Sequence, residues 1–173
     1  MNARSVIESL IASWNTQDVE TTLAHCSDDV FYALYVSEDA VPFGGVTVGK
    51  DAMRATLHMM LEQFDYLRFD RAIVGVDDDV VRVQTQFKFH HRRTGGNLEG
   101  TMRTVFRVKD GMVVRCDEYL DQGLVEAFMR LTQQREASGE VVQPPEIPRF
   151  GERRPEPVAT AGSKGPCEKE ECR

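Results

Sequence analysis

The chain has 173 residues, of which 41% are hydrophobic, so it is long enough for one domain with a buried core. Its formal net charge of −7 provides no basic surface for a phosphate backbone or an anionic membrane, and we expect neither nucleic acid nor membrane as a partner. No stretch is apolar over the length that crosses a bilayer, and Glu8 and Ser9 interrupt the apolar run that a secretory signal needs. We therefore expect a cytoplasmic protein.

The first part of the chain has the residue spacing of amphipathic helices separated by a strand. The apolar face of the first helix comprises Val6, Ile7, Leu10, Ile11 and Trp14. Asp18 is placed to cap a short second helix that runs through Leu23. A strand is predicted over residues 30–36, and a third amphipathic helix over residues 50–64.

Beyond residue 65 the hydrophobic period changes to two, which is typical of strands. Four strands are predicted over residues 66–76, 80–91, 98–108 and 112–121, with a closing helix over 124–134. Helices first and a strand meander afterwards indicate an α+β fold, with the helices packed on one face of a curved antiparallel sheet.

The composition changes near residue 138 and suggests a domain boundary there. We assign residues 1–137 to the folded domain and residues 138–173 to a tail, which holds six of the seven prolines and has mixed charge. The tail is expected to be disordered or draped on the surface; the alternative is a lid or partner-binding arm anchored through Ile147 and Phe150.

The four cysteines show no paired CxxC spacing, so we expect thiols in a reducing compartment. Cys167 and Cys172 remain able to pair under oxidation.

The stretch VVRCDEYLD, at the end of the predicted domain, places three carboxylates within a strand. In the preceding strand, Met102, Thr104 and Phe106 belong to the apolar, inward-facing set. A three-residue hairpin loop with Gly111 in the left-handed conformation would pair Val108 with Met112. Counting outward from that pair places Met102 opposite Glu118 and Thr104 opposite Cys116. Glu118 is then the inward carboxylate.

The pKa of a single inward carboxylate should differ from that of an exposed one. Burial among apolar residues raises the pKa of Glu118 toward the range that is useful for proton transfer. Two structural alternatives remain open: a bulge or a frayed strand could turn Glu118 to water, or Glu118 could satisfy a buried donor.

Three segments carry a resemblance to a known family: ASWNTQDVETTLAHCSDDVFY, VGKDAM and VFRVKDGMVVRCDEYLD. Over about residues 3 to 131 the chain resembles the SnoaL-like and ketosteroid isomerase-like branch of the nuclear transport factor 2-like superfamily. The resemblance implies a cone-shaped α+β barrel, a cavity between sheet and helices, and a homodimer. Family members include isomerases, cyclases, dehydratases, epoxide hydrolases and noncatalytic binders.

The catalytic residues that relatives use for each activity match this sequence to different degrees. The inward Arg and Asp of limonene epoxide hydrolases fall at Thr85 and Phe87, and the early-strand Tyr and Asn fall near Phe31 and Ala33, so epoxide hydrolysis is not expected. The steroid isomerases' Tyr and base fall at Leu10 and Leu34. A SnoaL-type cyclase uses one acid of the closing strand as a base, and Glu118 matches that role.

We predict a site built around Glu118, with His91 at the mouth of the pocket as a second catalytic candidate. The predicted ligand-binding residues are Trp14, Phe31, Tyr35, Met53, Leu57, Thr85, Phe87, Met102, Thr104 and Cys116. We predict no metal, because His58 and Glu62 lack a third ligand, and no cofactor.

Three hypotheses about function follow. The first is an isomerase, cyclase or dehydratase in which Glu118 performs acid–base chemistry on a small apolar carbonyl compound. The second is a noncatalytic ligand-binding dimer. The third is an interaction module whose tail recruits a partner.

Overall fold

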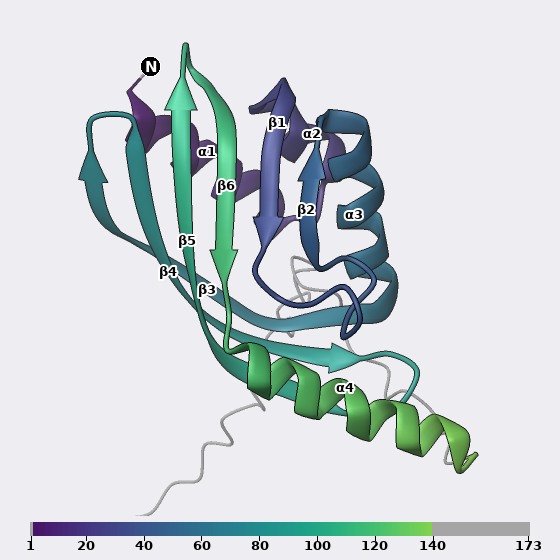
Figure 1. Ribbon diagram of the computed structural model, residues 1–173. Helices are drawn as coiled ribbons and strands as arrows, with labels where there is room; N and C mark the ends of the chain where they lie inside the picture. Colours follow the sequence, from purple (N-terminus) through teal and green to yellow (C-terminus); the bar gives the residue numbers. More distant parts are fainter. Residues whose placement is uncertain (1, 140–173) are drawn as a thin grey trace, which may run out of the picture.

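The computed structural model describes residues 2–139, and within this range the chain forms four helices and one six-stranded sheet. The strands are β1 (Cys26–Leu34), β2 (Gly45–Val48), β3 (Phe64–Asp77), β4 (Val80–His91), β5 (Asn97–Lys109) and β6 (Met112–Tyr119). Their order across the sheet is β2-β1-β6-β5-β4-β3 (Figure 1). The predicted α+β architecture with a curved meander is confirmed.

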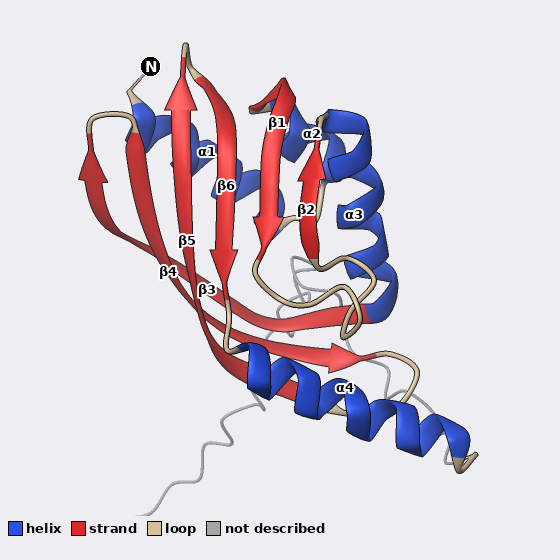
Figure 2. Cartoon of the chain, viewed as in Figure 1, coloured by secondary structure: helices blue, strands red, loops and turns tan. Residues whose placement is uncertain are grey.

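The helices are α1 (Ala3–Asn15), α2 (Val19–Ala24), α3 (Lys50–Gln63) and α4 (Gln122–Ala137). Figure 2 shows α1 passing behind the strands, α3 running alongside β2, and α4 crossing below the ends of the long strands. Among these helices none combines the length and the hydrophobicity that crossing a bilayer requires.

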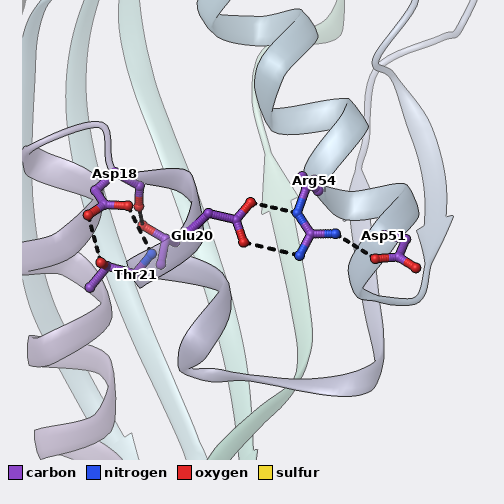
Figure 3. Close-up of polar contacts among 6 residues, drawn as sticks. Asp18, Glu20, Thr21, Asp51 and Arg54 are labelled. Atoms are coloured by element: carbon purple, nitrogen blue, oxygen red, sulfur yellow. Dashed lines mark hydrogen bonds and ion pairs between the residues drawn. The ribbon is translucent and has the colours of Figure 1, made fainter.

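Helix ends follow the capping residues of the sequence. The Asp18 side chain accepts a hydrogen bond from the Thr21 amide, as predicted, and this starts α2. Arg54 of α3 forms a two-point contact with Glu20 of α2 and also reaches Asp51, so one guanidinium ties the two helices together (Figure 3).

Two features of the sheet were not predicted. Strand β2 lies in a segment that the sequence analysis treats as a loop, and it pairs with β1. Strand β1 also pairs with β6 in the parallel direction, so the sheet is mixed: the first and last strands of the domain meet at its centre.

The hairpin between β5 and β6 corrects the predicted register. Asp110 and Gly111 both have positive φ, 53° and 78°, so the loop has two residues and pairs Lys109 with Met112. A bulge then shifts the register, and Glu118 lies opposite Thr104 instead of Met102. The final displacement is two positions, which preserves side-chain parity, so Glu118 still faces inward.

The described range ends shortly after α4, which is slightly longer than the predicted helix at 124–134. The expectations for the tail, including Ile147, Phe150 and the pairing of Cys167 with Cys172, lie outside the described residues.

Candidate functional site

Glu118 lies near the end of β6, on the face of the sheet that the helices cover. Glu118 is only 9% exposed, and it borders a cavity of about 90 Å³ between the helices and the strands. The predicted inward orientation is therefore confirmed, and the bulge does not turn this carboxylate to water.

The cavity wall is mostly apolar. Its apolar side chains include Leu10 and Trp14 from α1, Met53, Leu57 and Met60 from α3, Val36, Val41 and Phe43 from the segment after β1, Val125 from α4, and Phe69, Phe89, Met102, Phe106 and Cys116 from the sheet. An apolar wall with a few convergent polar groups is the usual composition of a small-molecule site.

Polar side chains from three strands meet at one end of the cavity. The Tyr32 hydroxyl of β1 donates a hydrogen bond of 2.8 Å to Glu118 Oε2. Arg71 of β3 approaches from the other side, with Nη2 3.8 Å from Glu118 Oε1. This second distance is too long for a hydrogen bond, so the contact between Arg71 and Glu118 is a charge pair.

The pKa of Glu118 is set by opposing influences. Burial raises the pKa above its usual value of 4.5, whereas the charge of Arg71 and the hydrogen bond from Tyr32 lower it, and the net direction is upward. Burial lowers the pKa of Arg71, but a guanidinium starts so high that Arg71 remains a cation. A carboxyl group with a raised pKa beside a fixed cation is a candidate for proton transfer.

Several buried polar atoms around this pair have no hydrogen-bond partner among the described residues. They are Arg71 Nε and Nη1, Thr85 Oγ1 and Thr104 Oγ1. Thr85 is paired with Arg71 across β3 and β4, and Thr104 is paired with Glu118 across β5 and β6. Of these residues only Arg71 lines the cavity, and because buried polar groups are rarely left unsatisfied, its unpaired nitrogens are the unusual feature of this site.

The predicted ligand-binding residues fall into three groups. Five of them line the cavity: Trp14, Met53, Leu57, Met102 and Cys116. Three are fully or almost fully buried in the strands but do not line the cavity: Thr85, Phe87 and Thr104.

Phe31 and Tyr35 lie elsewhere. Phe31 in β1 and Tyr35 directly after it alternate with Tyr32 and Leu34, so they face the other side of the sheet. There the Arg115 guanidinium covers the Phe31 ring at 4.3 Å, and the Tyr35 hydroxyl donates to Asp117. These two residues are not part of the candidate site.

His91 is also separate from the cavity beside Glu118. Its ring Nδ1 is 2.8 Å from Thr94 Oγ1, and burial lowers its pKa. The residue borders a different, more polar groove between the end of α3 and α4. The structure therefore does not bring His91 and Glu118 together.

The outer face of the sheet holds the other carboxylates of the closing segment. Arg115 makes a two-point contact with Asp117, and the Tyr35 ring stacks on Tyr119 at 4.5 Å between centroids. Asp121 does not join this face, because its side chain accepts from the Leu124 amide and caps α4.

Four polar residues of the cavity were missed by sequence reasoning: Thr22, Tyr32, Tyr66 and Arg71. Tyr32 could have been found, because it lies midway between the apolar Val30 and Leu34 at period two. Phe69 and Ile73 flank Arg71 at the same spacing, but counting from Tyr66 places it on the opposite face, so the sequence alone leaves its orientation open.

The fold and the cavity define the chain as an α+β protein of the nuclear transport factor 2-like (NTF2-like) type with an apolar cavity. The sequence model of the SnoaL-like domain family matches residues 7–116. The chain therefore belongs to the SnoaL-like domain family, as the resemblance predicted. No curated protein matches the sequence significantly.

Solved structures show the same fold at low sequence identity. An NTF2-like protein of unknown function from Burkholderia pseudomallei is 15% identical, with a TM-score of 0.68 over 75% of this chain and 98% of that chain. A protein from Xanthomonas campestris pv. campestris, classed provisionally as a polyketide cyclase, is 17% identical, with a TM-score of 0.60 over 73% and 96%. TerC, co-crystallised with polyporic acid, is 15% identical, with a TM-score of 0.61 over 74% and 98%.

Proposed function

We propose that this protein is a cofactor-independent enzyme that moves a proton on a small, largely apolar carbonyl compound, with Glu118 as the acid–base group. The observation that carries the proposal is the position of Glu118: a buried carboxyl group with a raised pKa at the polar end of an otherwise apolar cavity. Isomerisation, cyclisation and dehydration all begin with this kind of proton abstraction.

The reaction starts with Glu118 ionised. The carboxylate takes a proton from the carbon next to the carbonyl, the electron pair of the C–H bond moves to form an enolate, and Glu118 becomes a neutral acid. Return of the proton to another carbon completes an isomerisation, and loss of a hydroxide equivalent with that proton completes a dehydration. A raised pKa makes Glu118 a stronger base than a solvated carboxylate.

Tyr32 has a positioning role in this scheme. Its hydroxyl holds Oε2 at 2.8 Å, which fixes the rotation of the carboxyl group. Burial strongly raises the pKa of Tyr32 itself, so its hydroxyl stays a donor throughout. Apolar neighbours keep bulk water away from the reacting atoms.

The test is proton exchange at carbon in deuterated water. A panel of small ketones and enones is followed by NMR with and without protein. We expect the protein to accelerate exchange for a subset of the panel, and Glu118→Gln to lower that acceleration by about 10²–10⁴-fold.

Glu99→Gln is the matched control, since Glu99 is an exposed carboxylate on β5 that pairs with Lys88. It should leave exchange unchanged. If Glu118→Gln exchanges protons as fast as the unaltered protein, Glu118 is not the base.

A noncatalytic binding protein is the second candidate function. The observation in its favour is that the described residues around the cavity supply one carboxyl group and no histidine, so no second carboxyl or imidazole group accompanies the base. Native mass spectrometry of the purified protein for a retained small molecule, combined with no exchange activity, would favour this candidate.

We further propose that the protein forms a homodimer through the outer face of the sheet. The stacked Tyr35 and Tyr119 rings, the Arg115–Asp117 pair and the nearby Arg103 supply a polar, aromatic surface of the composition that interfaces use. Light scattering at low and high salt tests this proposal, and a monomer mass under both conditions contradicts it.

A further inference from the structure

Arg71 is more deeply buried than an arginine normally is. Its side chain is 5% exposed, it lines the cavity, and neither Nε nor Nη1 has a hydrogen-bond partner among the described residues. A guanidinium has five N–H donors and a permanent charge. Burying it with most of these donors unpaired therefore costs free energy. Its contact with Glu118, at 3.8 Å, does not meet that need.

The guanidinium is held in place on its apolar side. Its central carbon lies 4.3 Å from the centre of the Phe69 ring, which fixes the plane of the group. Nη2 is directed to Glu118, and Nε and Nη1 are enclosed without a hydrogen-bond partner among the described residues. A buried, oriented and incompletely paired guanidinium is the arrangement with which proteins recognise carboxylates.

We propose that the compound bound in this cavity carries a carboxylate, which Arg71 binds, while the apolar wall takes the remainder of the molecule. The inference rests on the proposed function and names its substrate class: a short carbonyl compound with an acid group, such as an oxo acid. The Arg71 N–H groups would donate to the carboxylate oxygens, and the carbon to be deprotonated would lie toward Glu118.

The size of the cavity limits the ligand. At about 90 Å³ it is smaller than the cavity of about 150 Å³ that holds a benzene molecule in a protein core. Short aliphatic acids are therefore the appropriate probes.

A bound carboxylate also changes the balance of charge between Arg71 and Glu118. With Glu118 ionised, the Arg71–Glu118 pair is neutral, and a bound carboxylate would bring an uncompensated negative charge. With Glu118 protonated, Arg71 and the ligand form a neutral pair. Binding of the acid should therefore raise the pKa of Glu118 and be accompanied by uptake of a proton there. In the complex the ionised fraction of Glu118, which grows with pH, is the form that takes the proton from carbon.

Other titratable groups face Glu118 but do not compete for this proton. Tyr32 on β1, Tyr66 on β3 and Cys116 on β6 all have pKa values raised by burial, so they stay neutral. Arg71 stays positive. Glu118 is therefore the facing group whose charge state responds to a bound carboxylate.

The experiment compares carboxylates with their neutral amides of the same shape. Acetate, propionate and butyrate are titrated against the corresponding primary amides by calorimetry and NMR. We expect the protein to prefer the carboxylate by about tenfold or more, because a hydrogen bond to a charged group is stronger than one to a neutral group. Calorimetry in two buffers of different ionisation enthalpy should show proton uptake of up to about one per ligand.

Three variants test whether Arg71 causes the carboxylate preference and Glu118 the proton uptake. Arg71→Met should lose the preference for the carboxylate. Arg68→Met, an exposed arginine three positions earlier on β3, should keep it. Glu118→Gln should bind the carboxylate at least as tightly as the unaltered protein, without proton uptake, because the competing negative charge is gone.

Two results would overturn the inference: equal affinity for acid and amide in the unaltered protein, or an unchanged preference in Arg71→Met. If Arg71→Met does not fold, Arg71→Lys replaces it; that variant keeps the charge with a different donor geometry and should weaken carboxylate binding without affecting amide binding. Neither failure affects the proposed role of Glu118, which depends on proton exchange in Glu118→Gln. Conversely, a carboxylate preference without exchange activity would identify a binding protein for acids.

Discussion

Replacing Tyr32 with phenylalanine should raise the pKa of Glu118. The substitution removes the hydroxyl that donates to Oε2 at 2.8 Å and keeps the buried ring. The hydrogen bond stabilises the ionised form of Glu118, so its loss favours the protonated form.

The size of this pKa increase follows from the charge of the accepting carboxyl group. A hydrogen bond to a charged group contributes about 1.5–3 kcal/mol, against about 0.5–1.5 kcal/mol for a neutral pair. The difference of about 1–2 kcal/mol corresponds to a pKa increase of about one unit, since one unit is 1.36 kcal/mol.

The same change predicts a pH-dependent loss of stability. Because the folded pKa of Glu118 lies above the usual 4.5, the folded state holds this proton where the unfolded state has lost it. The stabilisation from Glu118 is thus complete below about pH 4.5 and is lost as the pH rises through the folded pKa. Tyr32→Phe moves the upper end of this window upward, so the variant should be more destabilised at neutral pH than at acid pH.

The assay is a carboxyl-carbon NMR titration of both proteins, with urea unfolding at acid and neutral pH. Tyr35→Phe serves as a control, because the Tyr35 hydroxyl contacts Asp117 on the outer face. An unchanged Glu118 pKa in Tyr32→Phe, or an equal loss of stability at both pH values, would refute the argument.

Three further predictions concern the fold. Gly111→Ala should destabilise the domain by about 1 kcal/mol in urea unfolding, because φ is 78° in the two-residue turn; an unchanged midpoint would mean that the turn relaxes without strain. Phe87→Ala should cost about 3–5 kcal/mol, since this ring is 2% exposed and stacks on Phe89, and a cost below about 1 kcal/mol would show that the core closes over the gap. Deleting residues 139–173 should move the melting temperature by only a few degrees in calorimetry, and a large drop would show that the tail packs on the domain.

The sequence predicts the inward face of β6 well, but not its register. Alternation along the strand depends on local periodicity alone, so Glu118 could be assigned to the inner face from its neighbours. The register depends on how many residues form the turn and whether a bulge follows. A loop of two residues plus a bulge and a loop of three residues lead to the same parity, and the periodicity does not distinguish them.

Arg71 was harder to place, for a reason that lies in β3. Tyr66 and Phe69 are both buried on the inner face although they are three positions apart, because the register shifts between Tyr66 and Arg68. Counting in steps of two from Tyr66 puts Arg71 outside, whereas counting from Phe69 puts it inside. Only the pairing of β3 with β4 in the folded structure decides between the inner and the outer face for Arg71.

The error at Phe31 has a similar origin. Phe31 is an apolar residue of a predicted strand, but apolar character does not assign a side chain to a face, and in a strand one residue is the difference between the two faces. The periodicity of Val30, Tyr32 and Leu34 in β1 is the better guide to the inner face.

The parallel pairing of β1 with β6 has a consequence for how the protein is made. Tyr32 and Glu118 are separated by 86 residues, and β1 has only the short β2 as a partner until β6 exists. A chain emerging from the ribosome therefore carries an unpaired inner edge on β1 through the synthesis of β3, β4 and β5. The hydrogen bond between Tyr32 and Glu118 can form only once the last strand has entered the sheet, so the polar end of the cavity is completed among the final steps of folding.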